Sequence, residues 1–139
     1  MNPAPAIGYS GTPLAKKLGI KEACQVFLIE PPDDFVDWLQ PLPQGVIFVQ
    51  PLSAETDMVI VFALHKTMLA QHLSRCRKVI RANAMIWACW PKKSSGVASD
   101  ISEDIIREVA LPIGLVDIKV CAISAIWSGL KLVIRKELR

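Results

Sequence analysis

Hydrophobic residues in this chain follow two patterns, short runs that are apolar on both faces and longer stretches with helical spacing. Runs apolar on both faces are typical of strands buried between two layers. They occur at residues 24–29, 46–49, 58–64 and 84–90. The stretch 66–81 instead repeats apolar side chains at the interval of one helix face, namely Leu69, Leu73, Cys76 and Ile80. Strands that alternate with helices predict an α/β fold.

Three shorter helices are also expected. The first runs from the cap residue Thr12 to residue 18 and stops at Gly19. The second is capped by Asp33 or Asp34 and runs through Trp38. A third begins at Asp100, which has the spacing of a capping box with Glu103, and ends before residue 112. Within it, Glu103 and Arg107 have the i, i+4 spacing of an ion pair.

The C-terminal part alternates apolar and polar residues over 116–122 and 130–135, which predicts an antiparallel hairpin with one wet face and a loop at 123–129. The whole pattern predicts a three-layer α/β sandwich with a mostly parallel sheet. It resembles the class I methyltransferase variant of the Rossmann architecture, shortened by about one βα unit. Residues 50–57 are too few for a helical crossover. Either this connection is extended, or the strand at 46–49 lies antiparallel.

Length and composition favour one globular domain over residues 1–139, with an N-terminal segment, 1–22, before the sheet and helices of 23–139. A hydrophobic fraction of 52% argues against disorder. The longest apolar runs are far shorter than the roughly 18 residues of a membrane span. The N-terminus shows no export signal, and four cysteines without a C-x-x-C pair are typical of free thiols in a reducing compartment. We therefore expect a cytoplasmic protein that does not enter a membrane.

The net charge of +3 says little about partners. Nucleic acid ranks last, because no aromatic residue interleaves the basic face of the 66–81 helix. We expect a small anion or a protein as partner. The strand at 46–49 carries no charge, so as a sheet edge it should be covered by the N-terminal segment or by a second subunit in a homodimer.

The principal candidate site is the heptapeptide WPKKSSG, which follows a predicted core strand. Open α/β sheets bind ligands at the carboxyl ends of their strands. Two cations and two hydroxyls ahead of a helix can hold an anion, although a solvated surface loop would have the same composition. The candidate binding residues are Trp90, Lys92, Lys93, Ser94, Ser95 and Gly96.

Weaker candidates lie elsewhere. Ser10 and Thr12 could hold an anion before the first helix, but a plain helix cap explains them as well. Trp127 is either a lid over the core or a pocket wall shared with Trp90. His65, His72 and Cys76 share one side of a helix without an evident fourth ligand, so we expect no metal site.

The turn after the first strand reads Glu30-Pro31-Pro32-Asp33-Asp34. A nucleotide-binding turn needs glycines, so that backbone amides can approach the ligand. This turn has no glycine, two prolines without an amide hydrogen, and three carboxylates that repel an anion. We expect no cofactor here, neither S-adenosylmethionine nor NAD. Nor does the chain show a recognisable catalytic triad.

Four segments together resemble the small bacterial domain-of-unknown-function family numbered 3052. They are GYSGTPLAKKLGIK at 8–21, WPKKSSG, LVDIKV at 115–120 and WSGLKLV at 127–133. The resemblance implies a bacterial cytoplasmic α/β protein without an established activity, and it assigns no catalytic residue. The family's turn after the first strand contains glycine or small residues, from which Pro31-Pro32-Asp33-Asp34 departs.

These observations favour a non-catalytic binding or regulatory domain on a degenerate methyltransferase-like scaffold, rather than an enzyme. The alternative is a small enzyme that acts on an anionic substrate held by the loop from Trp90 to Gly96. Lys92 or Lys93 would then bind the substrate's charge, and Ser94 or Ser95 would contact it.

Overall fold

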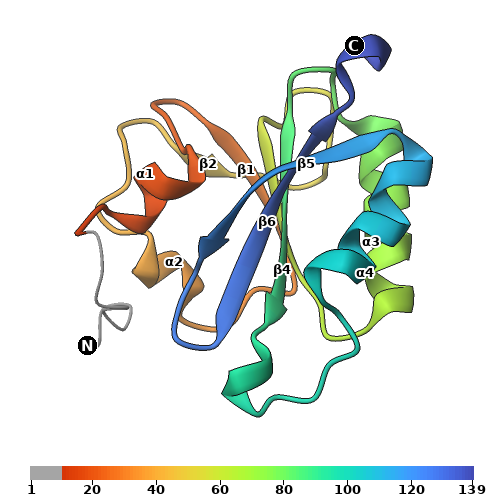
Figure 1. Ribbon diagram of the computed structural model, residues 1–139. Coiled ribbons are helices and arrows are strands. Elements are labelled where there is room, and N and C mark those ends of the chain that lie inside the picture. Colours follow the sequence, from red (N-terminus) through yellow and green to blue (C-terminus); the bar gives the residue numbers. More distant parts are fainter. Residues whose placement is uncertain (1–10) are drawn as a thin grey trace.

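The computed structural model describes residues 11–139, whose strands form one six-stranded sheet (Figure 1). The strands are β1 (Gln25–Ile29), β2 (Ile47–Phe48), β3 (Met58–Phe62), β4 (Met85–Pro91), β5 (Leu115–Ala122) and β6 (Trp127–Ile134). Their order is β2-β1-β3-β4-β6-β5. The first four are parallel, β6 is antiparallel to β4, and β5 is antiparallel to β6. This confirms the predicted α/β sheet with its C-terminal antiparallel hairpin.

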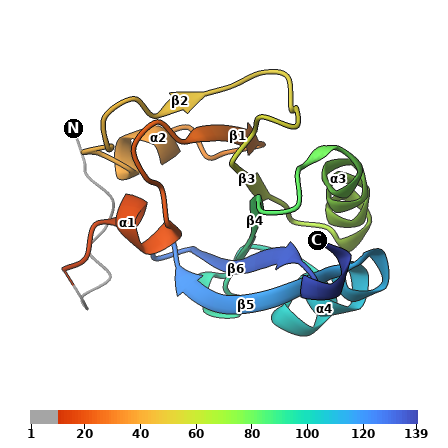
Figure 2. The ribbon, with the colours of Figure 1, turned by 90° about the horizontal axis from the view of Figure 1, so that it is seen from above.

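Helices cover both faces of the sheet (Figure 2). One face packs against α1 (Leu14–Leu18) and α2 (Phe35–Trp38), and the other against α3 (Lys66–Val79) and α4 (Glu103–Ala110). Single-turn 3₁₀ helices lie at η1 (Lys93–Ser95), η2 (Leu111–Ile113) and η3 (Lys136–Leu138). In the described part of the chain, no helix is long and apolar enough to span a bilayer.

The core on the α3 face contains the predicted apolar stripe. Leu69, Leu73, Cys76 and Ile80 are all buried there, as their spacing predicts. The helix ends two residues earlier than expected, at Val79, because Ile80 already has an extended backbone. On the opposite face Trp87 is fully buried and donates its indole N–H to the carbonyl of Leu18 at 2.9 Å, which holds α1 against β4.

The connection between β2 and β3 crosses the sheet without a helix. β2 pairs parallel with one side of β1, and β3 pairs parallel with the other. Residues 49–57 therefore run extended across β1, which confirms the first alternative and makes the antiparallel one wrong. Two consequences follow. The chain reverses its direction of travel through the sheet between β1 and β3, and the crossover itself contributes no helix to the α3 face.

The expected uncharged edge strand is present but short. Within this strand only Ile47 and Phe48 have strand pairing, and these residues are 50% and 38% exposed. One of the two proposed covers was the N-terminal segment, residues 1–22. Residues 1–10 of this segment lie outside the described residues, and its helix α1 packs in the core on the Trp87 face of the sheet. Pairing of this edge with a second subunit stays a prediction.

The starts of two helices differ from the expectation. α1 begins at Leu14 with Pro13 in the N-cap position, one residue late, although it ends at Leu18 as predicted, with Gly19 at a φ of +85°. α4 begins at Glu103, not near Asp100. Its N-cap is Ser102, whose Oγ accepts the N–H of Ile105 at 3.2 Å.

The predicted capping box fails because Asp100 serves another helix. Its Oδ1 accepts the N–H of Lys66 at 2.7 Å, so it satisfies a backbone donor at the start of α3. The expected pair within α4 is present, since Arg107 Nη2 and Glu103 Oε1 are 3.0 Å apart. Arg107 also contacts Asp117 on β5, and it thereby ties α4 to the edge of the sheet.

Candidate functional site

A cavity of about 390 Å³ opens at the carboxyl ends of β1 and β3, where the chain changes direction through the sheet. Open α/β sheets bind their ligands at this point. The elements that meet here are the turn after β1, the loops after β3 and β4, one side of α3 and the start of β6. The lining residues are Glu30, Pro31, Pro32, Phe62, Ala63, Leu64, His65, Met68, His72, Val97 and Trp127. We call this cavity the switch-point pocket.

Glu30 is the first residue after β1 and brings a carboxylate to the pocket. Its backbone φ is +52°, a left-handed conformation that residues other than glycine rarely adopt. Such a backbone costs about 1–2 kcal/mol. Strain of this kind is concentrated at functional sites, where surrounding structure holds it in place. The following residues, Pro31 and Pro32, offer no amide hydrogen to a ligand.

Aromatic rings form the wall of the pocket next to β6. The ring of Phe62, at the end of β3, meets the Trp127 ring edge to face with centroids 5.1 Å apart. Phe35 of α2 packs on the other side of Phe62 at 4.9 Å. These contacts fix Trp127 at the pocket. The predicted lid over the core is therefore also a pocket wall.

Two histidines line the pocket near α3. Burial lowers the pKa of His72, the Arg75 charge lowers it further, and the Glu30 carboxylate opposes this in part. The imidazole is therefore neutral at pH 7 and can accept a proton. Cys76, in contrast, faces the core, where burial raises the pKa of its thiol to about 11. Within residues 11–139 no three His, Cys, Asp or Glu side chains are grouped to hold a metal ion.

The WPKKSSG loop lies at the same edge of the sheet, as predicted. β4 extends to Pro91, η1 follows, and Gly96 has a φ of +79°. Ser95 Oγ donates to the carbonyl of Lys92 at 2.6 Å and accepts the N–H of Val97 at 3.2 Å. The Ser95 hydroxyl is thus used to shape the loop.

A second cavity, of about 320 Å³, lies beside this loop, and we call it the loop pocket. The candidates Trp90, Lys93 and Gly96 line it, together with Pro91, Val97, Ala98, Ser99, Ile101 and Ser102. Lys92, Ser94 and Ser95 are not part of its lining. Val97 belongs to both cavities, so the switch-point pocket and the loop pocket are neighbours.

The remaining candidates are not brought together. Trp90 is buried in the core on the α3 face, while Trp127 packs on the opposite face, so the two indoles do not form a common wall. Ser10 lies outside the described residues. Thr12 precedes Pro13, the N-cap of a helix of only five residues.

Glu30, His65 and His72 line the switch-point pocket, although we expected no cofactor at the turn that contains Glu30 and no metal at the two histidines. The missing information was the strand order, because Glu30 follows β1 whereas the two histidines belong to α3 and its N-cap, which follow β3. One signal was available. The connection over 50–57 is too short for a helix, which already suggested an unusual path through the sheet next to β1.

Comparisons with known proteins show the fold. No protein-family model matches the chain, and no curated protein matches it. An S-adenosylmethionine-dependent methyltransferase from Aquifex aeolicus superposes with a TM-score of 0.61 at 13% identity, over 88% of each chain. A putative type 11 methyltransferase from Sulfolobus solfataricus gives 0.57 at 10% identity, over 81% of this chain and 85% of that one. An O-methyltransferase of neocarzinostatin biosynthesis, in complex with S-adenosylmethionine, gives 0.53 at 18% identity, over 80% and 41%.

These similarities correct the functional expectation. The fold is the methyltransferase-like Rossmann fold. The three matched structures above are named as methyltransferases, one of them with S-adenosylmethionine bound, and a further match, LepI, is described in complex with S-adenosylhomocysteine. A non-catalytic binding or regulatory domain is contradicted by this finding, and so is the expectation that the protein is not an enzyme. Three residues of the turn after β1, Glu30, Pro31 and Pro32, line one side of the switch-point pocket, and other elements complete it.

Proposed function

We propose that the protein is a methyltransferase that binds S-adenosylmethionine in the switch-point pocket. The observation that carries the proposal is the position of this pocket, at the carboxyl ends of β1 and β3 in a methyltransferase-like sheet. Its volume of about 390 Å³ falls within the range of small-molecule sites. When bound, this cofactor supplies an electrophilic methyl group for transfer to a nucleophile.

The lining of the pocket suits a cationic donor with a large ring system. Phe62, Met68 and Trp127 provide apolar and aromatic surface, and aromatic faces attract a cation such as a sulfonium. Glu30 adds a carboxylate that attracts the positive charges of the donor and can accept hydrogen bonds from a ribose. The turn with Pro31 and Pro32 offers no amides to the donor's own carboxylate, so the Glu30 side and the aromatic wall must supply most of the affinity.

Two residues are placed to serve the methyl acceptor. His72, with its lowered pKa, is neutral at pH 7, and an imidazole nitrogen of this residue can take the proton of an acceptor hydroxyl or amine. Lys93 lines the adjoining loop pocket, where its ammonium group can hold an anionic group of the acceptor. Val97, shared by both cavities, separates the two ligands. Of the cations and hydroxyls predicted to hold an anion, Lys93 thus becomes an acceptor-binding residue in this proposal.

Calorimetric titration with S-adenosylmethionine tests the donor site. We expect saturable binding to the wild-type protein and binding weakened by about tenfold or more in Glu30→Gln, because the ion pair with the donor is lost. Asp33→Asn is the matched control, since Asp33 is an exposed carboxyl in the same turn that does not line the pocket. The absence of binding at millimolar donor, or equal affinities in the wild type and Glu30→Gln, would refute the donor site.

Membership of family 3052, with a bacterial and cytoplasmic origin, is part of the same proposal. It is supported by the motifs at 8–21 and 90–96. Immunodetection of the protein in soluble and membrane fractions of its host would test the location.

A further inference from the structure

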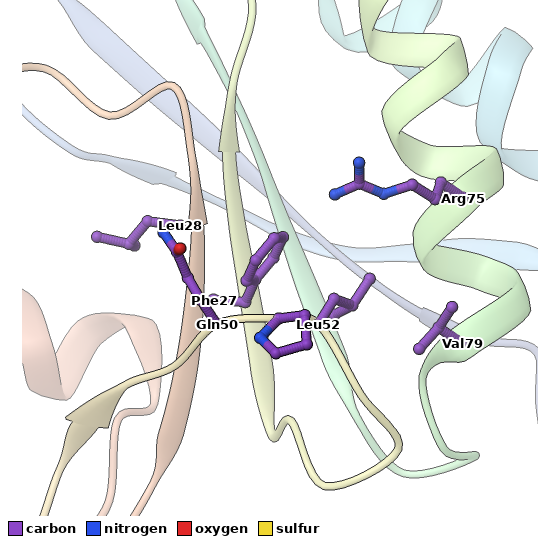
Figure 3. A pocket seen from close by; sticks show the side chains of 7 residues that line it. Phe27, Leu28, Gln50, Leu52, Arg75 and Val79 are labelled. Carbon is purple, nitrogen blue, oxygen red and sulfur yellow. The ribbon is translucent and has the colours of Figure 1, made fainter.

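A third concave surface lies on the α3 face of β1 (Figure 3). It measures about 740 Å³ and shares no lining residue with the switch-point pocket. Its lining residues are Phe27, Leu28, Gln50, Pro51, Leu52, Arg75 and Val79. We call it the β1 groove.

The groove exists because of the helix-free crossover. Parallel strands are usually joined through a helix, which covers the sheet face that it crosses. Residues 49–57 contain no helix, and only side chains such as Val49 and Leu52 pack against the core on this face. The space between this segment and α3 therefore stays open above Phe27, a core residue of β1.

One cation stands over the apolar floor of the groove. Figure 3 shows the Arg75 side chain extending from α3 toward the strand that carries Phe27. Its guanidinium carbon is 5.9 Å from the centroid of the Phe27 ring, a cation–π distance. Arg75 makes no ion pair with any carboxylate of residues 11–139, and no acidic residue lines the groove. Its fork of N–H donors remains available to an anion.

The groove also contains an uncharged polar side chain, that of Gln50. The side-chain amide of Gln50 lines the groove and makes no hydrogen bond to another residue in the described range. Small-molecule sites combine an apolar lining with a few convergent polar groups in this way. A single guanidinium matches a single carboxylate in two parallel hydrogen bonds. An aromatic floor and apolar walls favour a flat ligand body.

We propose that the β1 groove binds a small aromatic monocarboxylate, with the carboxylate on Arg75 and the ring against Leu52 and Val79. This site is separate from the proposed donor site and does not depend on the proposed reaction. Indoleacetate is a suitable probe, and indoleacetamide is its uncharged counterpart of almost the same shape.

Calorimetry with both compounds tests the carboxylate contact. We expect the wild-type protein to bind indoleacetate about tenfold or more tightly than indoleacetamide, as the loss of a charged hydrogen-bonded pair predicts. Arg75→Met should abolish this difference, while Lys78→Met, a change of an exposed cation on the same helix outside the groove, should preserve it. Equal affinities for both compounds, an undiminished preference in Arg75→Met, or no binding at millimolar indoleacetate would overturn the proposal.

A second variant tests the place of binding without touching Arg75. Val79→Glu puts a carboxylate one helical turn after Arg75, at the i, i+4 spacing at which the two can pair. We expect this variant to lose indoleacetate binding, with its far-ultraviolet circular dichroism and its cooperative thermal unfolding retained. Unaltered indoleacetate binding would contradict the proposal. A concentration-dependent dimer that Val79→Glu dissociates, without indoleacetate binding to the wild type, would show that a second copy occupies the groove instead.

Discussion

The carboxylate of Asp57 accepts the backbone N–H of Gln25 at 2.6 Å, through Oδ2. Its other oxygen is paired with the guanidinium of Arg81, and Arg81 also donates to the carbonyl of Thr56 at 3.1 Å. Asp57 directly precedes β3, Gln25 begins β1, and Arg81 follows α3. One partly buried side chain thus joins the start of two neighbouring parallel strands to the turn that leads into β4.

This arrangement predicts a stability that depends on acid pH. Burial opposes ionisation of Asp57, but the hydrogen bonds from Gln25 and Arg81 and the Arg81 charge outweigh it, so its pKa is lowered. A carboxyl with a lower pKa in the folded state contributes stability above its unfolded pKa of about 3.9 and loses it as pH falls through the folded pKa. At pH 7, Asp57→Asn should reduce the free energy of unfolding by about 1–3 kcal/mol.

Denaturant unfolding at a series of pH values measures this contribution. The difference between the wild type and Asp57→Asn should be constant from pH 7 to about pH 5 and shrink below about pH 4. Asp33→Asn, a change of an exposed carboxyl that makes no ion pair in the described part of the chain, should differ little from the wild type. A difference between wild type and Asp57→Asn that stays the same at pH 3 would show that the negative charge is not what stabilises this junction.

The second prediction concerns the N-cap of α4, which is Ser102 and not Asp100. Ser102→Ala removes the N-cap of α4 and should lower the free energy of unfolding by about 1 kcal/mol. Ser94→Ala changes an exposed hydroxyl that makes no hydrogen bond within residues 11–139, so it should have almost no effect. Both are measured by thermal or denaturant unfolding.

The location of the Asp100 effect can be tested separately by amide hydrogen exchange. In Asp100→Ala, protection should fall in the first turn of α3, where the Lys66 amide loses its acceptor. Protection of α4 should change less. A larger loss of protection in α4 than in α3 would contradict this role of Asp100 and support the predicted capping box between Asp100 and Glu103.

Patterns that are local in sequence predicted much of the fold. The stripe of Leu69, Leu73 and Cys76 is buried because helical spacing alone determines which face those residues share. The hairpin followed from simple alternation in the C-terminal segments. The role of Asp100 could not be predicted in this way, because its partner Lys66 is 34 residues away.

The candidate site was predicted only where local sequence patterns determine it. The loop after β4 could be located, since it follows an obvious strand. The switch-point pocket could not, because Glu30, His65 and Trp127 meet only once the strand order is known. The β1 groove is open because the crossover from β2 to β3 contains no helix. In the sequence this crossover is visible only as a short connection, which does not indicate a groove.

The four cysteines give a third prediction. All are buried and unpaired, and burial raises the pKa of each thiol, that of Cys76 to about 11. At pH 8 only about one Cys76 thiol in a thousand is ionised, and the thiolate is the reactive form. We expect the native protein to react with an aromatic disulfide reagent only slowly at pH 8, and all four thiols to react at once in denaturant. Rapid reaction of a native thiol would place that cysteine in a more open environment than the core.

The last prediction concerns Gly129, which lies in β6 opposite Cys89 and Cys121. A Cβ added there would come within 3.1 Å of both Ile123 Cδ1 and Trp87 Cε3, and within 3.3 Å of Cys89 Sγ. These neighbours are buried, so they have little room to move. Gly129→Ala should therefore lower the free energy of unfolding by about 1–3 kcal/mol through overpacking.

A double-mutant cycle with Ile123→Val separates overpacking from other causes. Alone, Ile123→Val removes the Cδ1 methyl and should cost about 0.5–1.5 kcal/mol, as other buried Ile→Val changes do. In the Gly129→Ala background the same methyl is one of the atoms that clashes, so its removal should cost less or should stabilise the protein. Strictly additive effects would mean that the methyl introduced by Gly129→Ala is accommodated without pressing on Ile123. The close approach of the Trp87 ring would then be the remaining reason for glycine at this position.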